Sequence, residues 1–165
     1  MPTGPAARAN IDATAHGLPP VLTPGPGCLT CMIGFMPAWR GVPLAAVAAL
    51  QSAKSAVDAA INTAVAATAA AAGTPGAPAA YAAEQATKGA ALASMGGMIS
   101  GMGTDIHLCT VPSPVPPHGP GVDITPSATV SIGFLPAGRL GDTLLEAIGP
   151  PNTIVKGEVT VIIGG

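Results

Sequence analysis

The chain has 165 residues, of which 8% are charged and 2% aromatic, with 22 glycines, 19 prolines and a net charge of −2. This length indicates about one domain, and six scattered Lys and Arg side chains exclude a basic patch for nucleic-acid phosphates. Three cysteines fit a secreted disulfide framework poorly and favour thiols or a metal ligand in a reducing compartment. The N-terminus lacks the pattern of a secretion signal, so we expect the protein to start in the cytoplasm.

Composition divides the chain into a Pro/Gly-rich segment 1–43, an Ala-rich segment 44–102 and a second Pro/Gly-rich segment 103–165. The outer segments share a repeated unit, first as Ile33-Gly34-Phe35-Met36-Pro37-Ala38-Trp39-Arg40-Gly41 and again as Ile132-Gly133-Phe134-Leu135-Pro136-Ala137-Gly138-Arg139. Its Pro-Ala-x-Arg part also occurs at Pro5-Ala6-Ala7-Arg8. The apolar run 159–163 resembles the start of a fourth unit, so the sequence predicts three units and a fourth approach that stops at the C-terminus.

Short β-branched runs precede these units and each ends on glycine, which predicts a strand followed by a tight turn. Proline then prevents the strand from continuing inside a sheet. We therefore expect a mainly β, compact, loop-rich fold with pseudo-symmetry in segments 1–43 and 103–165.

The Ala-rich segment predicts two helices, at about 44–72 and 78–100, because alanine is the best helix former and apolar residues recur there at helical spacing. Gly73-Thr74-Pro75-Gly76 separates them. The hairpin is interpreted as a structural insertion that packs on the β part or on a partner. The alternative is a membrane-active segment, although Lys54 and Asp58 within one helix disfavour spanning.

The histidines and one cysteine suggest a metal site. His107 and Cys109 are two residues apart, so they point to the same side of an extended stretch. With His16 and His118 they supply three imidazoles and one thiolate, a closed tetrahedral set typical of structural Zn²⁺, although iron remains possible. The alternative is three surface histidines and a buried cysteine. A small fold poor in aromatic residues gains from such a metal, because zinc binding adds to the free energy of folding.

Other signals are weak. Cys28-Leu29-Thr30-Cys31 has the spacing of a zinc half-site or redox pair, but a buried core position is the favoured interpretation. The common nucleophile, phosphate-loop and metalloprotease motifs are absent from the sequence. The acids form no convincing catalytic pair, so we expect no enzymatic activity.

The Pro-Ala-x-Arg units, together with Gly149-Pro150-Pro151-Asn152-Thr153-Ile154-Val155-Lys156-Gly157, resemble the PAAR-repeat proteins that sharpen the spikes of type VI secretion systems and related contractile injection particles. The resemblance covers about 1–43 and 103–165. It implies a small metal-stapled cone of β-hairpins whose base caps a trimeric VgrG-type spike protein, one cone per spike, and whose metal is held by His16, His107, Cys109 and His118.

The same resemblance implies assembly in the bacterial cytoplasm, transient contact with a target membrane on firing, and in some cases a cargo effector. Two features depart from the family pattern. Trp39 and Gly138 replace the usual second alanine, which we expect to be harmless if that position faces solvent, and the helical insertion 44–102 is absent from minimal members. A second hypothesis is therefore a cargo adaptor or membrane-active protein that works through the insertion.

Overall fold

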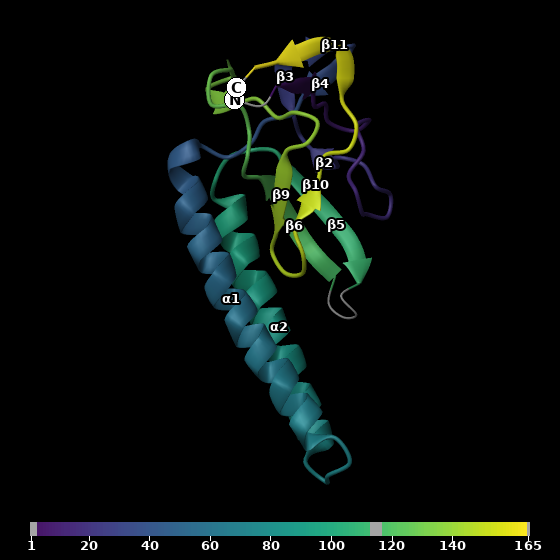
Figure 1. The fold of residues 1–165 in the computed structure, drawn as a ribbon, viewed down its shortest axis with the longest axis vertical. Helices are drawn as coiled ribbons and strands as arrows, with labels where there is room; N and C mark the ends of the chain where they lie inside the picture. The colour runs from purple at the N-terminus through teal and green to yellow at the C-terminus, as the bar shows by residue number, and fades with distance from the viewer. Residues whose placement is uncertain (1–2, 113–116, 165) are drawn as a thin grey trace.

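The computed structural model describes residues 3–112 and 117–164 and places a β part beside a helical hairpin (Figure 1). The hairpin consists of α1 (Leu44–Ala71) and α2 (Ala77–Ser100), which confirms the two predicted helices. The strands are β1 (Gly4–Ala6), β2 (Pro24–Gly25), β3 (Cys28–Ile33), β4 (Met36–Ala38), β5 (Ile106–Pro112), β6 (Pro117–Asp123), β7 (Ser131–Ile132), β8 (Leu135–Pro136), β9 (Thr143–Glu146), β10 (Asn152–Thr153) and β11 (Glu158–Ile163). The fold is thus mixed α/β: the described strands lie in the two outer segments, and the insertion adds helices of 28 and 24 residues.

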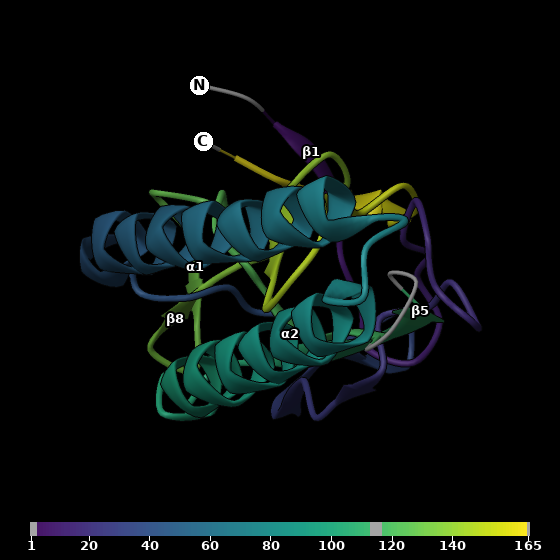
Figure 2. The same cartoon turned by 90° about the horizontal axis from the view of Figure 1, so that it is seen from below.

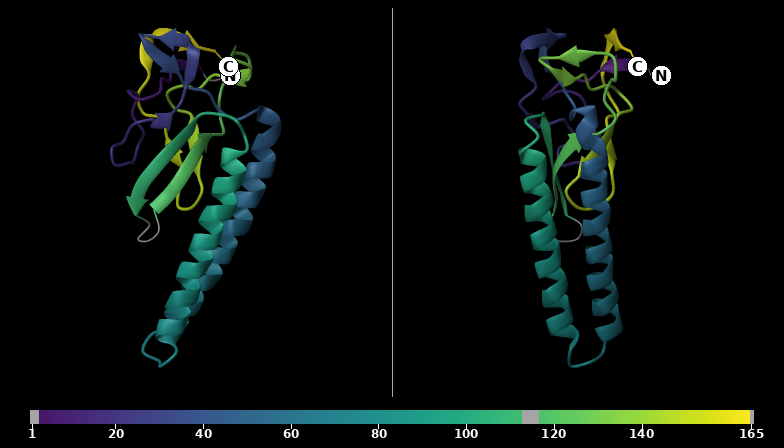
Figure 3. Two further views of the ribbon diagram at one scale, coloured as in Figure 1. Left: turned by 180° about the vertical axis from the view of Figure 1, so that it is seen from behind. Right: turned by 90° about the vertical axis from the view of Figure 1, so that its left-hand side faces the viewer.

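The helices run next to each other along the β part and continue past it (Figures 2 and 3). Only their proximal ends are anchored: Leu50, Met95 and Ile99 are fully buried against Val42 and Val122 of the β part. Val65 of α1 is 41% exposed and lines a cavity together with Ile148 and Gly149 of the β part. The distal half of the hairpin therefore derives its stability from alanine propensity and helix–helix contact, without a large apolar core.

A five-stranded antiparallel sheet, in the order β10-β9-β6-β5-β2, forms the centre of the β part. Its register places His107 opposite Gly121 and Cys109 opposite Gly119. Gly121 in turn lies opposite Glu146. Side chains in one such row point to the same face of a sheet, so this register brings residues from three strands together.

Three two-stranded ribbons lie at the end of the molecule opposite the hairpin turn (Figures 1 and 3). They are β3–β4, β7–β8 and β1–β11. The C-terminal strand does not begin a fourth unit, contrary to expectation, because it pairs with β1 and supplies the strand that the first unit lacks in sequence. The three units are therefore complete, and the chain ends close the set.

Two closed rings of backbone hydrogen bonds join the three units around a pseudo-threefold axis. In the first, Trp39 N donates to Ala7 O (2.8 Å), Ala7 N to Gly138 O (3.0 Å) and Gly138 N to Trp39 O (2.9 Å). In the second, the donors are the residues after each arginine and the acceptors are the prolines of the units: Ala9 N to Pro37 O, Gly41 N to Pro136 O and Leu140 N to Pro5 O (2.8–2.9 Å). Within each ring every unit donates to one neighbour and accepts from the other, and the two rings run in opposite directions.

Each arginine of a unit forms a bidentate ion pair with a buried aspartate: Arg8 with Asp12, Arg40 with Asp105 and Arg139 with Asp142. Bidentate guanidinium–carboxylate pairs fix geometry as well as contributing energy. The repeated arginine therefore locks each corner of the ring.

Trp39 and Gly138 face the axis and not solvent, so the condition under which we expected these replacements to be harmless is not met. Trp39 is fully buried, and a Cβ at Gly138 would lie 2.9 Å from Trp39 Cδ1. The third equivalent residue, Ala7, is 1% exposed. One ring position thus holds a large, a small and an intermediate residue that complement one another in volume.

Candidate metal centre

Four side chains bring possible metal ligands together at the end of the β part away from the ribbons. His16, Cys109, His118 and Glu146 each offer one ligand atom, and these atoms all lie within 4.8 Å of one another. Cys109 comes from β5, His118 from β6 and Glu146 from the end of β9, while His16 lies in the loop before β2. The sequence separates these residues widely. The register of β5, β6 and β9 places Cys109 and Glu146 on one face of the sheet, whereas His118 lies in the irregular part of β6, next to Gly119 with its φ of 81°.

Three of the distances between ligand atoms are close to those of a tetrahedral site. His16 Nε2 lies 3.2 Å from both His118 Nδ1 and Glu146 Oε2, and Cys109 Sγ lies 3.6 Å from His118 Nδ1. A zinc ion about 2.0 Å from nitrogen or oxygen and about 2.3 Å from sulfur leaves tetrahedral ligand atoms about 3.3–3.6 Å apart. The pair His118 Nδ1 and Glu146 Oε2, at 2.6 Å, is closer, as expected for a direct hydrogen bond. These residues fit a bound metal.

Asn152 orients two of the four side chains. Its Nδ2 donates to Glu146 Oε1 (2.9 Å) and to the carbonyl oxygen of His16 (2.7 Å), while its Oδ1 accepts from the His16 backbone N–H (3.2 Å). Such outer partners fix metal ligands in place. The asparagine of the Gly-Pro-Pro-Asn phrase is therefore part of the site.

Gly149 gives the His118 ring its space. A Cβ at this position would lie 2.7 Å from His118 Cδ2 and 2.8 Å from its Nε2, and the backbone has φ +82°. Any other residue would strain the turn and collide with the ring. The glycine of the same phrase therefore also serves the site.

The site is closed on most sides. Cys109 and Glu146 are fully buried and His118 is 5% exposed, whereas the His16 side chain is 29% exposed and forms the wall toward solvent. Burial raises the pKa of the Cys109 thiol to about 11, and the nearby Glu146 carboxylate adds to this rise. The thiol is therefore protonated in the metal-free chain, and metal binding would release a proton.

The structure brings together three of the four predicted ligands, His16, Cys109 and His118, and the fourth member of the group is Glu146. His107 does not belong to this group. It is fully buried, and burial lowers its pKa, opposed by the Glu146 charge and by the backbone carbonyls of Thr23 and Val21. Sequence reasoning missed Glu146, although an acid inside the apolar run 144–148 is a signal for a specific buried role.

Cys28 and Cys31 lie on β3, in the β3–β4 ribbon at the end of the β part away from this centre. Cys28 is 4% exposed, Cys31 is half-buried, and both pack against the apolar cluster of Ala6, Ala38 and Ile163. A hydrogen bond with Thr30 lowers the pKa of Cys28. This placement agrees with their interpretation as core residues.

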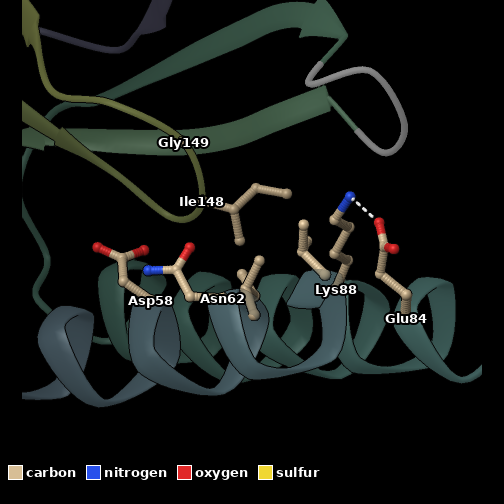
Figure 4. A pocket seen from close by; sticks show the side chains of 8 residues that line it. Asp58, Asn62, Glu84, Lys88, Ile148 and Gly149 are labelled. Atoms are coloured by element: carbon tan, nitrogen blue, oxygen red, sulfur yellow. Dashed lines mark hydrogen bonds and ion pairs between the residues drawn. The ribbon is translucent and has the colours of Figure 1, made fainter. Parts of the chain in front are cut away.

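A cavity of about 560 Å³ separates the hairpin from the turn after β9 (Figure 4). It is lined by Asp58, Ile61, Asn62, Val65, Glu84, Lys88, Ile148 and Gly149. Its charged side chains are already paired: Lys88 donates to Glu84 (2.6 Å), and Lys54 at its edge binds Asp58 and donates to Gly149 O (3.0 Å). Each ion pair lies within one helix, and the Lys54–Gly149 hydrogen bond joins α1 to the β part. The pairs leave no free charge in the described lining for a ligand.

One helix, α1, is long and apolar enough to cross a membrane by length and composition alone, with a mean hydropathy of 1.2.

Comparison with family models, with curated proteins and with solved structures gave no match for this chain.

Proposed function

We propose that this protein is the metal-stapled tip of a contractile injection spike, a PAAR-type protein without catalytic activity that caps a trimeric VgrG-type partner. The proposal combines the resemblance of the repeated units with the arrangement of those units in space.

The pseudo-threefold rings carry the proposal. A single chain that caps a trimer has to present three similar surfaces to three identical subunits. Two closed hydrogen-bond rings and three bidentate Arg–Asp pairs give this chain three such corners. The rings thereby support a threefold docking partner.

The ribbon end has the surface expected of a docking base. Phe35 and Phe134 occupy equivalent turns, are 95% and 101% exposed, and both have positive φ (65° and 67°). A bulky residue in the left-handed region is strained, and a fully exposed phenylalanine gains nothing from folding. Leu29, Val159 and Ile162 add exposed apolar side chains on the neighbouring strands. Burial against a partner would account for this surface.

The metal centre lies at the other end of the β part, where the cone would narrow. There, a bound zinc or iron ion would cross-link the loop of His16 to three strands of the central sheet. Stapling this end would stiffen the small fold under load.

Binding of the trimeric spike protein tests the proposal. Phe35→Asn and Phe134→Asn remove the apolar rings, and asparagine tolerates positive φ, so the variants should fold. We expect each variant to weaken binding about tenfold or more, as for buried aromatic anchors. Tyr81→Asn on the hairpin, where the tyrosine is 53% exposed, should leave affinity unchanged. Unchanged binding by the Phe35/Phe134 double variant would refute docking through this end, as would a complex in which the three units meet unrelated surroundings.

The second candidate function is a cargo adaptor or membrane-active protein that acts through the hairpin. It is favoured by the exposed, uncharged stretch 59–83, which extends beyond the β part. Deletion of 44–102 discriminates the two: a tip should still bind the spike, whereas an adaptor should lose cargo or membrane association.

A further inference from the structure

We propose that Cys28 and Cys31 form a dithiol site that exchanges with low-molecular-weight disulfides, such as glutathione disulfide, and closes reversibly to an intramolecular disulfide. The site lies in β3, in the β3–β4 ribbon at the end of the β part away from the metal centre (Figure 1). The exchange requires neither the metal nor docking to a spike, so it goes beyond the proposed function and is tested separately from it.

A bulge in β3 folds up the chain between the two cysteines. Cys28 lies opposite Ala38 and Met32 lies opposite Pro37, so the four steps from Cys28 to Met32 face a single step of β4. Four steps of a regular strand advance by about 13 Å, whereas neighbouring Cα atoms are only about 3.8 Å apart. Folding up the segment brings residues three apart toward the Cα separation of about 4.4–6.8 Å that a disulfide requires.

Both cysteine side chains face the same apolar cluster. Cys28 belongs to the buried cluster described above for this ribbon, and Cys31 packs against it. The two residues between them, Leu29 and Thr30, are exposed. In a regular strand, residues three apart point to opposite faces. The bulge therefore turns both thiols to the buried side of the ribbon.

Polar groups around Cys28 favour its thiolate, the form that takes part in exchange. Thr30 Oγ1 lies 3.4 Å from Cys28 Sγ, and this hydrogen bond lowers the pKa of Cys28. The backbone N–H groups of Thr30 and Cys31 and the charge of Arg40 act in the same direction, against burial. The N–H of Cys31 is thus directed at Cys28 Sγ, which places the two residues within reach of each other.

The two thiols differ in access, which assigns them different steps. Cys31 is half-buried, so its thiolate attacks one sulfur of glutathione disulfide; the S–S bond of the reagent breaks, and a glutathione thiolate leaves and takes up the cysteine proton. Cys28, at 4% exposure, is closed to the reagent. Its thiolate attacks Cys31 Sγ in the mixed disulfide, releases the second glutathione thiolate to its proton and closes the ring. Two protein thiols are oxidised and one glutathione disulfide is reduced to two molecules of glutathione.

Exchange of the full, zinc-loaded wild-type chain in glutathione buffers tests the site directly. After acid quenching and alkylation of the remaining thiols, peptide mapping by mass spectrometry identifies the linked residues. We expect glutathione disulfide to link Cys28 to Cys31 and excess reduced glutathione to reopen the link. Cys109 is fully buried elsewhere in the β part and should stay outside the disulfide. A chain that stays reduced, or that keeps glutathione on Cys31 without closing, would overturn the proposal.

Matched variants separate the two steps. Cys28→Ala should accumulate the glutathione adduct on Cys31, because no second thiol displaces it, whereas Cys31→Ala should stay unmodified while the chain is folded. Thr30→Val keeps the side-chain shape and removes the hydroxyl, so ring closure should reach half its maximal rate at a higher pH than in the wild type. Equal adducts in the two alanine variants, or an unchanged pH profile in Thr30→Val, would overturn these roles.

Discussion

Trp39 and Gly138 form a large and small pair at the pseudo-threefold axis, and Gly138→Ala tests whether this pairing is required. The added Cβ would lie 2.9 Å from Trp39 Cδ1 and 3.0 Å from Asp123 Oδ2. Carbon atoms normally approach to about 3.5 Å, so the indole would have to move by about 0.6 Å or more. Trp39 is fully buried among Leu22, Leu144 and Ile154, which resist that movement.

The expected magnitude follows from core packing. Overpacking at Gly138→Ala should cost about 1–3 kcal/mol, and Trp39→Ala about 3–5 kcal/mol through the cavity it leaves. In the double variant the new methyl group partly fills that cavity, so the total should fall below the sum by about 0.5–3 kcal/mol. The double variant also gives all three ring positions the alanine of Ala7.

Urea unfolding followed by circular dichroism, at equal zinc content, measures these free energies. Gly89→Ala is the control, because nothing lies within 4 Å of its added Cβ and the helix should gain about 0.5–1 kcal/mol. Additive costs within about 0.5 kcal/mol would refute the proposed complementarity of Trp39 and Gly138.

Three further predictions concern buried polar groups. Asp105→Ala removes four hydrogen-bond acceptor contacts to Arg40 and Gly27 and should destabilise the chain by about 3–5 kcal/mol. Asp58→Ala, which breaks the partly exposed pair with Lys54 on α1, should cost less than about 1 kcal/mol by urea titration. Asn152→Ala should weaken zinc binding about 10–100-fold in a chelator competition, and Asn62→Ala on the exposed face of α1 should not. Burial, helped by the Asp142 charge, raises the pKa of Asp123 well above 3.8. At a pH above about 3.8 the folded state therefore still holds a proton that the unfolded state has released, so the free energy of unfolding should fall as the pH rises. Asp123→Asn should remove this dependence of the free energy of unfolding on pH, measured by urea titrations at several pH values.

The helices and repeated units could be predicted because their signals are local. Alanine propensity and the break at Gly73–Gly76 depend on neighbouring residues alone, and α1 and α2 begin and end within a residue or two of the predicted bounds. The closure of the ring, by contrast, has no local signal in the sequence. Pairing of β1 with β11 joins the two ends of the chain, and only the folded structure reveals that the last strand completes the first unit.

The metal centre could be predicted from the sequence only in part. Period-two spacing correctly placed His107 and Cys109 on one buried face, but ligation depends on which side chain reaches the centre from neighbouring strands. Glu146 reaches it through the register of β6 with β9, for which the sequence carries no direct signal. The burial of Trp39 was missed for a similar reason, since its space is created by Gly138, 99 positions later in the chain.

The hairpin leaves the ring at one corner only, and this has a consequence for imaging. On a threefold partner the chain could dock in three azimuthal orientations that place equivalent ribbons on equivalent subunits. A reconstruction averaged with threefold symmetry would spread α1 and α2 over three positions at about one third of their true density. An asymmetric reconstruction would recover the hairpin as a single off-axis rod, and its direction would report which corner of the ring faces each subunit.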